Sequence, residues 1–385
     1  MRVALVTETF PPEVNGVAMT LNRLCRGLLA IGHEVKVVRP LQQDESFDAL
    51  YPFEGGEQFV VPGIPLPGYD GLRMGRPALI NIYKDWKEWE PDVVHIATEG
   101  PLGIACLAAA GVLSIPTSST FHTNFHQYSQ HYKIGFFKDL FWVYLRQFHN
   151  RLGCTLPPTR EMADELIREG FERVNVLSRG VDTDLFSPEH RDPELRKLWG
   201  VSDGDRVYLY VGRVAAEKNI QLAIDAFEEI RISDKAAKMV VVGDGPELSR
   251  LKKKYSHIHY AGMQKGEDLA RHYASGDCFL FPSITETFGN VVTEAMSSGL
   301  AVLTYDYAAG RQCIVSGENG VLASFDDQVV FLEKARILAA CDGDTLLAMG
   351  EEARKTACSI SWDRIVVILL ESWQRVIAES RVRIC

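Results

Sequence analysis

Residues 207–230, VYLYVGRVAAEKNIQLAIDAFEEI, contain the pattern that decides the fold. Val207–Val211 is an uninterrupted apolar run, which is typical of a strand buried on both faces of a sheet. A polar loop follows from Gly212 to Asn219, and the residues from Ile220 to about Ile230 then have the apolar spacing of an amphipathic helix. Strand, loop and helix in this order predict the opening of a βαβ unit.

The same opening occurs at the start of the chain. Val3–Thr7 predicts a strand, a loop with two prolines follows, and an amphipathic helix is expected from about Val17 to Ile31. Further strands are expected at Glu34–Val38, Asp92–Ile96, Ser118–His122, Val174–Leu177, Lys238–Val242, near Tyr260, and at Cys278–Phe281 and Ala301–Tyr305, with helices at Glu247–Tyr255, Asp268–Ala274 and Asn290–Ser298. Strands separated by helices imply parallel sheets that are covered on both faces. The sequence therefore predicts an α/β protein with two Rossmann-like domains.

A polar, turn-rich stretch from Arg179 to Pro188 is the best candidate for the domain boundary. It predicts an N-terminal domain at residues 1–185 and a C-terminal domain at residues 186–364. The final helical stretch, Trp362 to about Glu379, has an apolar stripe that must pack on something. We expect residues of about 365–385 to return to the N-terminal domain. Ligands of such folds lie beyond the carboxyl ends of the strands, so we expect a site in a cleft that the two domains face.

Composition excludes several classes of protein. The 385 residues are 46% hydrophobic and 24% charged, which is ordinary for a globular protein and excludes a disordered or collagen-like chain. The net charge of −10 argues against a protein whose whole surface binds nucleic-acid phosphates. Eight scattered cysteines without a C-x-x-C motif favour reduced thiols and a cytoplasmic location. The first residues are typical of a strand rather than of a signal peptide, and no apolar run reaches membrane-spanning length.

Residues 283–299, SITETFGNVVTEAMSSG, are the most informative about function. They follow a predicted strand and run into a helix whose free N–H groups begin near Gly289 and Asn290, an arrangement that favours a phosphate. Glu286 in the loop and Glu294 one turn inside the helix could accept hydrogen bonds from a hexose and a ribose. They could instead be ordinary surface carboxylates. A glycosidase acid/base pair is disfavoured, because such a pair must face each other across the scissile bond.

Two other loops offer groups for a diphosphate. Arg213 presents a planar fork and Lys218 a point charge, although a solvated pair of cations in a turn is an equal alternative. Near the N-terminus, Gly16 precedes a predicted helix and can approach a phosphate or a sugar. The absence of G-x-G-x-x-G argues against a nicotinamide or flavin dinucleotide, and the run 243–246, GDGP, is better explained as a structural turn.

Metal motifs are present only in weak form. Asp182-Thr183-Asp184 and Asp342-Gly343-Asp344 match D-x-D, and His122 and His126, with His131 nearby, have helical spacing. Chance explains the aspartates better, and no H-E-x-x-H motif or cysteine partner supports zinc.

Taken together, these segments resemble a known family. The motifs are TETFGNVVTEAMSSGLAV at 285–302, GRVAAEKN at 212–219, VVGDGPEL at 241–248, GVDTDLFSP at 180–188, FHTNFH at 121–126 and PPEVNGVA at 11–18. They are similar to those of the retaining glycosyltransferases of family 4, which have the GT-B fold, and the resemblance covers nearly the whole chain. With YDYAAGRQ at 305–312, the chain is most similar to GDP-mannose-dependent α-mannosyltransferases and to related glycolipid hexosyltransferases.

The resemblance implies an acceptor-side N-terminal domain and a C-terminal domain that binds a nucleotide sugar. It implies that Glu286 holds the donor hexose, Glu294 the ribose, and that Arg213 and Lys218 neutralise the diphosphate. The other implied donor contacts are Gly16 at the diphosphate, Met263 near the base, and the backbone of Phe288, Gly289, Asn290 and Val291. His122 would contact the hexose and complete the catalytic set of His122, Glu286, Arg213 and Lys218. The implied mechanism is front-face transfer with retention, in which the leaving phosphate takes the acceptor's proton, with no metal and no cofactor.

The predicted function is therefore transfer of a hexose, with mannose from GDP-mannose as the best candidate, to a lipid or glycan hydroxyl in an α linkage. A glycolipid transferase that uses UDP-glucose or UDP-sulfoquinovose, a nucleotide-sugar epimerase and a non-catalytic sensor remain alternatives. Residues 131–151, HYKIGFFKDLFWVYLRQFHNR, are aromatic and basic and could rest on the inner face of an anionic membrane, although a core helix is the simpler interpretation. Nothing predicts a nucleic-acid partner.

Overall fold

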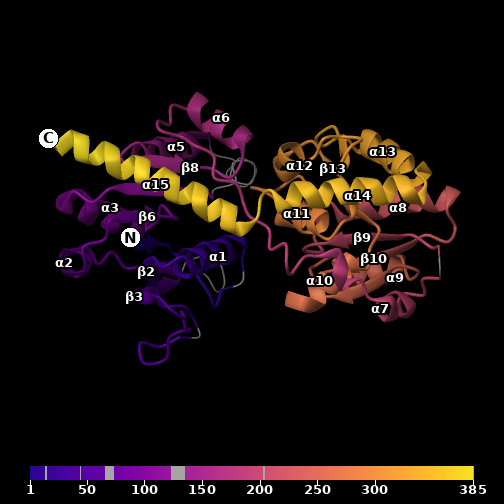
Figure 1. The fold of residues 1–385 in the computed structure, drawn as a ribbon, viewed down its shortest axis with the longest axis horizontal. Coiled ribbons are helices and arrows are strands. Elements are labelled where there is room, and N and C mark those ends of the chain that lie inside the picture. Colours follow the sequence, from indigo (N-terminus) through magenta and orange to yellow (C-terminus); the bar gives the residue numbers. More distant parts are fainter. Residues whose placement is uncertain (14, 44, 66–72, 123–134, 203, 385) are drawn as a thin grey trace. The chain divides into compact units, whose positions relative to one another are not determined.

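The computed structural model describes residues 1–385 except 14, 44, 66–72, 123–134, 203 and 385 (Figure 1). Contacts between Cα atoms divide the chain into two compact units. Unit 1 comprises Met1–Arg179 and Trp362–Cys385, and unit 2 comprises Gly180–Ser361. Each unit contains a six-stranded parallel sheet.

In unit 1 the strand order is β3-β2-β1-β6-β7-β8. The strands are β1 (Arg2–Val6), β2 (Glu34–Pro40), β3 (Glu57–Val61), β6 (Val93–Ile96), β7 (Thr117–Thr120) and β8 (Cys154–Leu156), and β4 (Gly63–Pro65) and β5 (Arg73–Gly75) form a separate antiparallel pair. The helices are α1 (Gly16–Ala30), α2 (Leu79–Trp89), α3 (Pro101–Leu113), α5 (Gly135–His149), α6 (Arg160–Arg168) and α15 (Trp362–Ile384).

Side-chain alternation along β1 explains why helices cover both faces of this sheet. Val3 and Leu5 point to one face, where they pack with residues of α1 and α15. Ala4 and Val6 point to the other face, where they pack with residues of α2 and α3. A strand that is apolar at every position is thus buried on both sides, and the predicted covered parallel sheet is confirmed.

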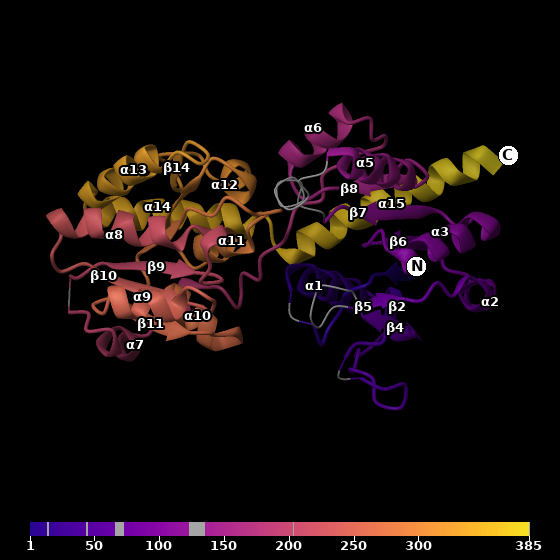
Figure 2. The same ribbon diagram turned by 180° about the vertical axis from the view of Figure 1, so that it is seen from behind.

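Helix α15 lies along unit 1 in both ribbon views (Figures 1 and 2). It packs so closely on α1 that a Cβ atom on Gly27 would lie 2.6 Å from Val366. Farther along, the buried Trp373 donates a hydrogen bond from Nε1 to Ser118 Oγ at 2.8 Å. The expected return of the final helix to the N-terminal domain is therefore confirmed.

In unit 2 the strand order is β11-β10-β9-β12-β13-β14. The strands are β9 (Val207–Val211), β10 (Lys238–Val242), β11 (His259–Gly262), β12 (Cys278–Phe281), β13 (Ala301–Tyr305) and β14 (Val321–Ala323). The helices are η1 (Pro188–His190), α7 (Pro193–Leu198), η2 (Ala216–Lys218), α8 (Ile220–Ser233), α9 (Leu248–Lys254), α10 (Gly266–Ala274), α11 (Asn290–Ser297), α12 (Ala308–Cys313), α13 (Gln328–Ala340) and α14 (Gly343–Cys358). Because β9 lies between β10 and β12, the loops that leave β9 and β12 start from neighbouring strand ends.

The strand predicted at Val174–Leu177 is wrong. This segment runs beside β8, where Asn175 N donates to Thr155 O at 3.0 Å and Leu177 N donates to Pro157 O at 2.9 Å. Only Val174 forms a bridge with Thr155, because Pro157 has no N–H to donate to the backbone oxygen of Asn175, and the ladder stops there. The sixth strand of unit 1 is the shorter β8 instead.

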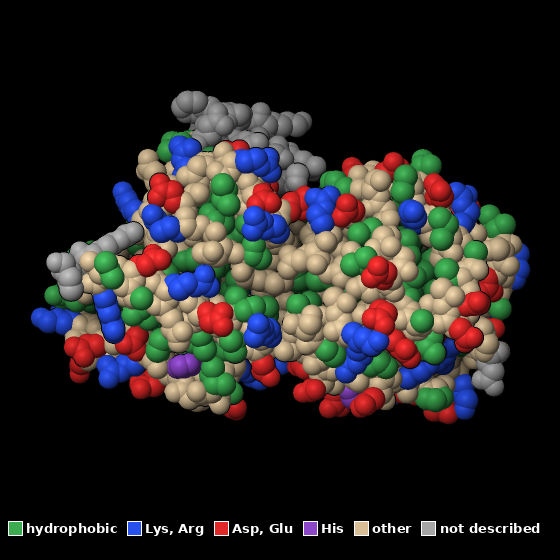
Figure 3. Space-filling view, turned by 45° about the horizontal axis from the view of Figure 1, so that its top comes forward, with side chains coloured by type: hydrophobic (Ala, Val, Ile, Leu, Met, Phe, Trp, Pro, Cys, Tyr) green, Lys and Arg blue, Asp and Glu red, His purple; other side chains and the backbone are tan. Residues whose placement is uncertain are grey.

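The molecular surface carries charges of both signs. Figure 3 shows acidic and basic side chains interspersed on one face, as the mixed composition leads one to expect. Among the residues that the structure describes, no helix has both the length and the hydrophobicity needed to cross a bilayer.

Candidate functional site

The loops after β9 and β12 meet in an ion pair. Lys218 Nζ lies 2.5 Å from Glu286 Oε1 and also donates to the backbone oxygen of Thr285 at 3.2 Å. The two charged side chains are only 21% and 17% exposed, so water screens their attraction less than at an open surface. Two of the residues singled out in the sequence are thus in direct contact at the carboxyl edge of the sheet.

Glu286 is held by neighbours on several sides. Ser283 Oγ donates to the same Oε1 at 2.7 Å, and the hydroxyl of Tyr307 donates to the Glu286 backbone oxygen at 2.6 Å. The other carboxylate oxygen, Oε2, makes no hydrogen bond to a described residue. A carboxylate that is fixed through one oxygen and open at the other can accept hydrogen bonds from the hydroxyls of a sugar.

Arg213 lies in the same loop as Lys218 but is more exposed. Its Nη1 pairs with Glu217 Oε1 at 2.6 Å, and its side chain is 64% exposed. Thr285 Oγ1 donates to the backbone oxygen of Glu217 at 3.0 Å and thereby joins the two loops. Both predicted cations therefore have carboxylate partners within unit 2.

The GDGP turn, residues 243–246, follows the neighbouring strand β10 and packs against the backbone of the loop that begins at Gly212. A Cβ atom on Gly243 would lie 1.9 Å from the backbone oxygen of Gly212, and one on Gly245 would lie 2.3 Å from that of Val214. Only glycine allows this approach, and Val214 N donates to Asp244 O at 2.9 Å across it. The interpretation of this run as a structural turn is confirmed.

Helix α11 begins at the end of the Glu286 loop. Its N-cap Gly289 has a left-handed φ of 94° and supplies no side-chain cap, so the positive end of the helix dipole is left for another anion. Asn290 and Val291 are the first residues of this helix, and the buried Phe288 accepts a hydrogen bond at its backbone oxygen from Ala309 N at 2.7 Å.

Glu294 and Met263 occupy other parts of the same unit. Glu294, within α11, accepts a hydrogen bond at Oε2 from the hydroxyl of the buried Tyr273 at 3.0 Å. Met263 follows the edge strand β11 and is 60% exposed. Neither residue contacts the Lys218–Glu286 pair through a hydrogen bond or ion pair among the described residues.

Gly16 and His122 belong to unit 1. Gly16 is the first residue of α1, and the side chain of Asn15 caps the helix by accepting from Val17 N at 3.1 Å and Ala18 N at 2.9 Å. A Cβ atom on Gly16 would meet nothing within 4 Å, so the backbone there faces open space.

His122 lies two residues beyond the end of β7. Its Nδ1 accepts a hydrogen bond from Arg179 Nη2 at 2.5 Å, and its Nε2 is buried with no partner among the described residues. Burial and the adjacent Arg179 charge hold the pKa of His122 well below its usual value. Arg179 is itself buried, and burial lowers its pKa to about 10.

Sequence reasoning missed three residues that contact predicted site residues: Arg179, which contacts His122, and Ser283 and Tyr307, which contact Glu286. Arg179 was assigned only to a boundary turn, and Ser283 and Tyr307 carry no motif that marks a partner of Glu286. Their roles depend on contacts between residues of different loops or segments. The spacing of residues within one segment cannot predict such contacts.

The weak metal motifs have local structural roles. Asp182 Oδ1 accepts from Leu185 N at 3.1 Å, and Asp342 caps α14 by accepting from Thr345 N at 2.8 Å. His126 and His131 lie outside the described residues. Within the described part of the chain, no group of three or more His, Cys, Asp and Glu side chains could hold a metal ion.

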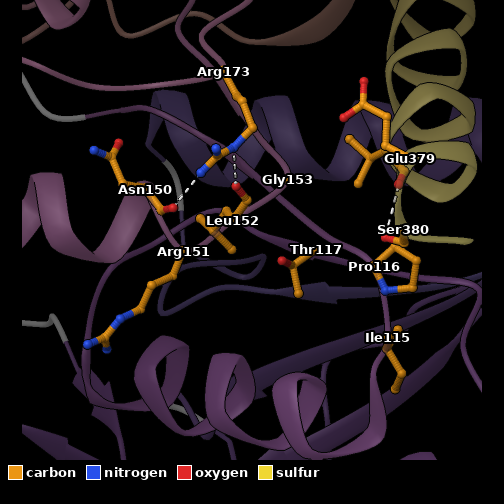
Figure 4. Close-up of a pocket in the computed structure, with 11 residues that line it drawn as sticks. Ile115, Pro116, Thr117, Asn150, Arg151, Leu152, Gly153, Arg173, Glu379 and Ser380 are labelled. Carbon is orange, nitrogen blue, oxygen red and sulfur yellow. Dashed lines mark hydrogen bonds between the residues drawn. The ribbon is translucent and has the colours of Figure 1, made fainter. Parts of the chain in front are cut away.

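A cavity of about 200 Å³ lies in unit 1 at the opposite edge of the sheet from His122 (Figure 4). Its lining includes Thr117 and Gly153, at the amino ends of β7 and β8, together with Glu379 of α15. The guanidinium of Arg173 donates hydrogen bonds to the backbone oxygens of Asn150 and Leu152 (Figure 4). The cavity contains none of the predicted site residues.

Comparisons with known proteins agree with this architecture. The family described as Glycosyltransferase Family 4 matches residues 14–185, and the family described as Glycosyl transferases group 1 matches residues 191–356. The chain is 32% identical over 383 residues to a GDP-mannose-dependent alpha-mannosyltransferase of Corynebacterium glutamicum, covering 99% of this chain and 90% of the relative. It is 28% identical over 372 residues to a sulfoquinovosyl transferase of Arabidopsis thaliana, covering 94% of this chain and 71% of the relative.

A solved structure supports the fold. The Anabaena protein HepE in complex with UDP superposes with a TM-score of 0.77 at 17% sequence identity, covering 97% of this chain and all of that chain. At this identity the likeness concerns the fold alone. Two Rossmann-like halves, two matching families and a relative above 30% identity over almost the full length lead to one conclusion: the chain is a glycosyltransferase of family 4 with the GT-B fold.

Proposed function

We propose that this glycosyltransferase moves a hexose, with mannose from GDP-mannose as the first candidate, to a hydroxyl of a lipid or glycan acceptor with retention and in an α linkage. The observation that carries the proposal is the Lys218–Glu286 pair beside the uncapped start of α11. This group combines a cation, the N-terminus of a helix without a side-chain cap and a carboxylate, which are the kinds of partner that a diphosphate and a hexose use. The name of the mannosyltransferase relative favours GDP-mannose as the donor.

The residues present suit a reaction in which the donor diphosphate is the leaving group. Charge accumulates on that diphosphate in the transition state, and Lys218, Arg213 and the first N–H groups of α11 would stabilise it. Glu286 would orient the hexose through hydrogen bonds to its hydroxyls. The departing phosphate oxygen would take the acceptor's proton, so the proposal needs neither a metal nor a separate protein base.

The donor is identified by a direct assay. Purified protein is incubated with GDP-mannose, UDP-glucose or UDP-sulfoquinovose and an acceptor lipid extract, and the released diphosphate and the new anomeric proton are measured by NMR. We expect GDP release together with an α-configured product. Release of UDP would support the glycolipid-transferase alternative suggested by the Arabidopsis relative, and inverted product would contradict the retaining mechanism. Conversion of the donor sugar with no diphosphate release would indicate an epimerase.

A lipid acceptor is supported by the surface of α5. Leu145 and Phe148 of this helix are buried, whereas Leu140, Phe141 and Val143 are exposed. A helix that buries one apolar face and exposes another suits contact with a bilayer. Only part of the aromatic and basic stretch 131–151 is described, because 131–134 lie outside the described residues.

Vesicle flotation tests the membrane contact. We expect the wild type to float with anionic vesicles and Val143→Glu to lose most of this binding, because a charge on the apolar face opposes insertion. Val112→Glu, at a valine of α3 that is 72% exposed against 37% for Val143, is the control and should float normally. Equal flotation of both variants would contradict a membrane role for α5.

A further inference from the structure

The contact between Arg179 and His122 fixes the position of the imidazole proton. Arginine carries only hydrogen-bond donors, so the ring nitrogen that Arg179 Nη2 approaches at 2.5 Å must act as an acceptor. Nδ1 of His122 is therefore unprotonated, and the proton of the neutral ring is on Nε2. This assignment follows from the identity of the partner and not from an observed hydrogen.

The opposite ring nitrogen is the one without a partner. Nε2 of His122 is buried and makes no hydrogen bond to any described residue. A buried N–H without an acceptor is costly in a folded protein, so such a group usually marks a place for an ordered water, an ion or a reacting molecule. The N–H that Arg179 creates on His122 is thus the group left available to a substrate.

Two neighbouring buried histidines show the contrast. His95 contacts Ser118 Oγ at 2.9 Å and Thr120 Oγ1 at 3.3 Å, so both of its ring nitrogens have partners. His149 contacts Ser119 Oγ at 2.9 Å and the carboxylate of Glu99 at 3.1 Å. Of these three rings, His122 alone faces a cation and has an unpartnered nitrogen.

We propose that Arg179 is a positioning residue for sugar transfer, and that it holds His122 as a neutral ring which can only donate, through Nε2–H, to an oxygen of the donor hexose. The inference rests on the proposed function, since it assigns His122 to the hexose. A second proton could bind His122 only at Nδ1, where the positive charge of the Arg179 guanidinium opposes it. His122 therefore cannot serve as the base for the acceptor hydroxyl, which leaves that proton to the departing phosphate.

The test combines spectroscopy with kinetics. Protein labelled with ¹⁵N in its histidine rings gives separate signals for protonated and unprotonated ring nitrogens, and His122→Gln identifies the signals of His122. In the wild type we expect a protonated Nε2 and an unprotonated Nδ1 that do not change between pH 6 and pH 8. In Arg179→Met we expect a ring that titrates or mixes its tautomers, with kcat at least tenfold lower and a KM for the donor changed less than threefold. Arg179→Lys keeps a donor for Nδ1 and should restore the wild-type ring signals and part of kcat.

Arg173→Met is the control, because Arg173 is another arginine of unit 1, and its guanidinium bonds backbone oxygens at the opposite edge of the sheet from His122. It should leave the His122 signals and kcat unchanged. A proton on Nδ1 in the wild type, or unchanged His122 signals in Arg179→Met, would overturn the proposal. If Arg179→Met does not fold, the His122 ring signals of the wild type and of Arg179→Lys test the proposal. Expected ring signals in a wild type that transfers no hexose would refute the proposed function and leave the Arg179 contact intact.

Discussion

At the scale of single residues, Lys218 and Glu286 neutralise each other across two neighbouring loops. A diphosphate that binds Lys218 competes with Glu286 for the same cation. The pair holds both side chains in place, and in the proposed function donor binding would exchange one anionic partner of Lys218, Glu286, for another, the diphosphate.

The first prediction concerns the carboxylate. Glu286→Gln keeps the shape of the side chain but replaces the carboxylate by a neutral amide, which is a weaker acceptor for sugar hydroxyls. We therefore expect kcat for transfer to fall by roughly 100-fold or more. Steady-state kinetics with the identified donor measure this. Glu247→Gln, at a partly exposed carboxylate of unit 2 paired with Arg250, is the control and should retain wild-type kcat. A Glu286→Gln enzyme with wild-type turnover would remove Glu286 from the site.

The second prediction concerns Gly16. Gly16→Ala adds a methyl group that meets nothing in the protein, so the melting temperature should stay the same or rise slightly. If a diphosphate approaches the backbone there, the methyl group obstructs it, and the KM for the donor should rise about tenfold. Gly111→Ala in α3 also points into open space, so its melting temperature should likewise stay the same or rise slightly, and the KM for the donor should not change. An unchanged KM in Gly16→Ala would place the diphosphate elsewhere.

At the scale of elements, sequence periodicity predicted the central strands better than the short ones. The ends of β9, β10, β12 and β13 are those expected, because each is a mostly apolar run in which every residue but Lys238 is buried. The three-residue strands β4, β5, β8 and β14 were missed, since three residues are too few to show a period, and the five-residue edge strand β3 was missed as well. The local groups of the candidate site, such as Glu286 and Lys218, were readable from motifs. Their partners Ser283 and Tyr307 were not, because those contacts depend on how loops pack.

Glu8 joins three elements of unit 1 and leads to a third prediction, on pH. It follows β1 and accepts from Gly75 N, at the end of β5, at 2.5 Å and from Leu102 N, in the first turn of α3, at 3.2 Å. Burial outweighs these hydrogen bonds and raises the pKa of Glu8 to about 7. The folded protein thus holds this proton more tightly than the unfolded chain does. Its contribution to stability is present below about pH 4.5 and is lost as the pH rises to 7 and above.

We expect this loss to reach about 3 kcal/mol in the free energy of unfolding between pH 4.5 and 8. Urea unfolding across that range should show a smaller decline for Glu8→Gln than for the wild type, because glutamine does not titrate. Glu54→Gln, at an exposed carboxylate, should follow the wild type. Parallel curves for wild type and Glu8→Gln would show that Glu8 does not titrate in this range.

At the scale of the whole molecule, the chain ends in the unit in which it begins. Trp373 of α15 is buried among residues of the first sheet, and Ser118 of β7 accepts its indole hydrogen bond. The last helix is therefore part of the core of unit 1, although unit 2 precedes it in the sequence.

The fourth prediction follows from this arrangement. Trp373→Phe removes the hydrogen bond and part of the ring, and we expect it to cost about 1–3 kcal/mol in unit 1. Hydrogen exchange followed by mass spectrometry should show faster exchange in α1 and β7, with β9 and β12 unchanged. Equal acceleration in both units would mean that they unfold as one cooperative body.

The central claim is that Lys218 holds the donor diphosphate and Glu286 holds the hexose. Calorimetric titration of the wild type, Lys218→Met and Glu286→Gln with GDP, UDP and the matching nucleotide sugars tests it most directly. We predict that Lys218→Met weakens nucleoside diphosphate binding at least tenfold. Glu286→Gln should bind the diphosphate as well as the wild type or better, because Lys218 is released, yet lose the extra affinity that the sugar gives. Wild-type affinities for diphosphate and nucleotide sugar in both variants would contradict the account.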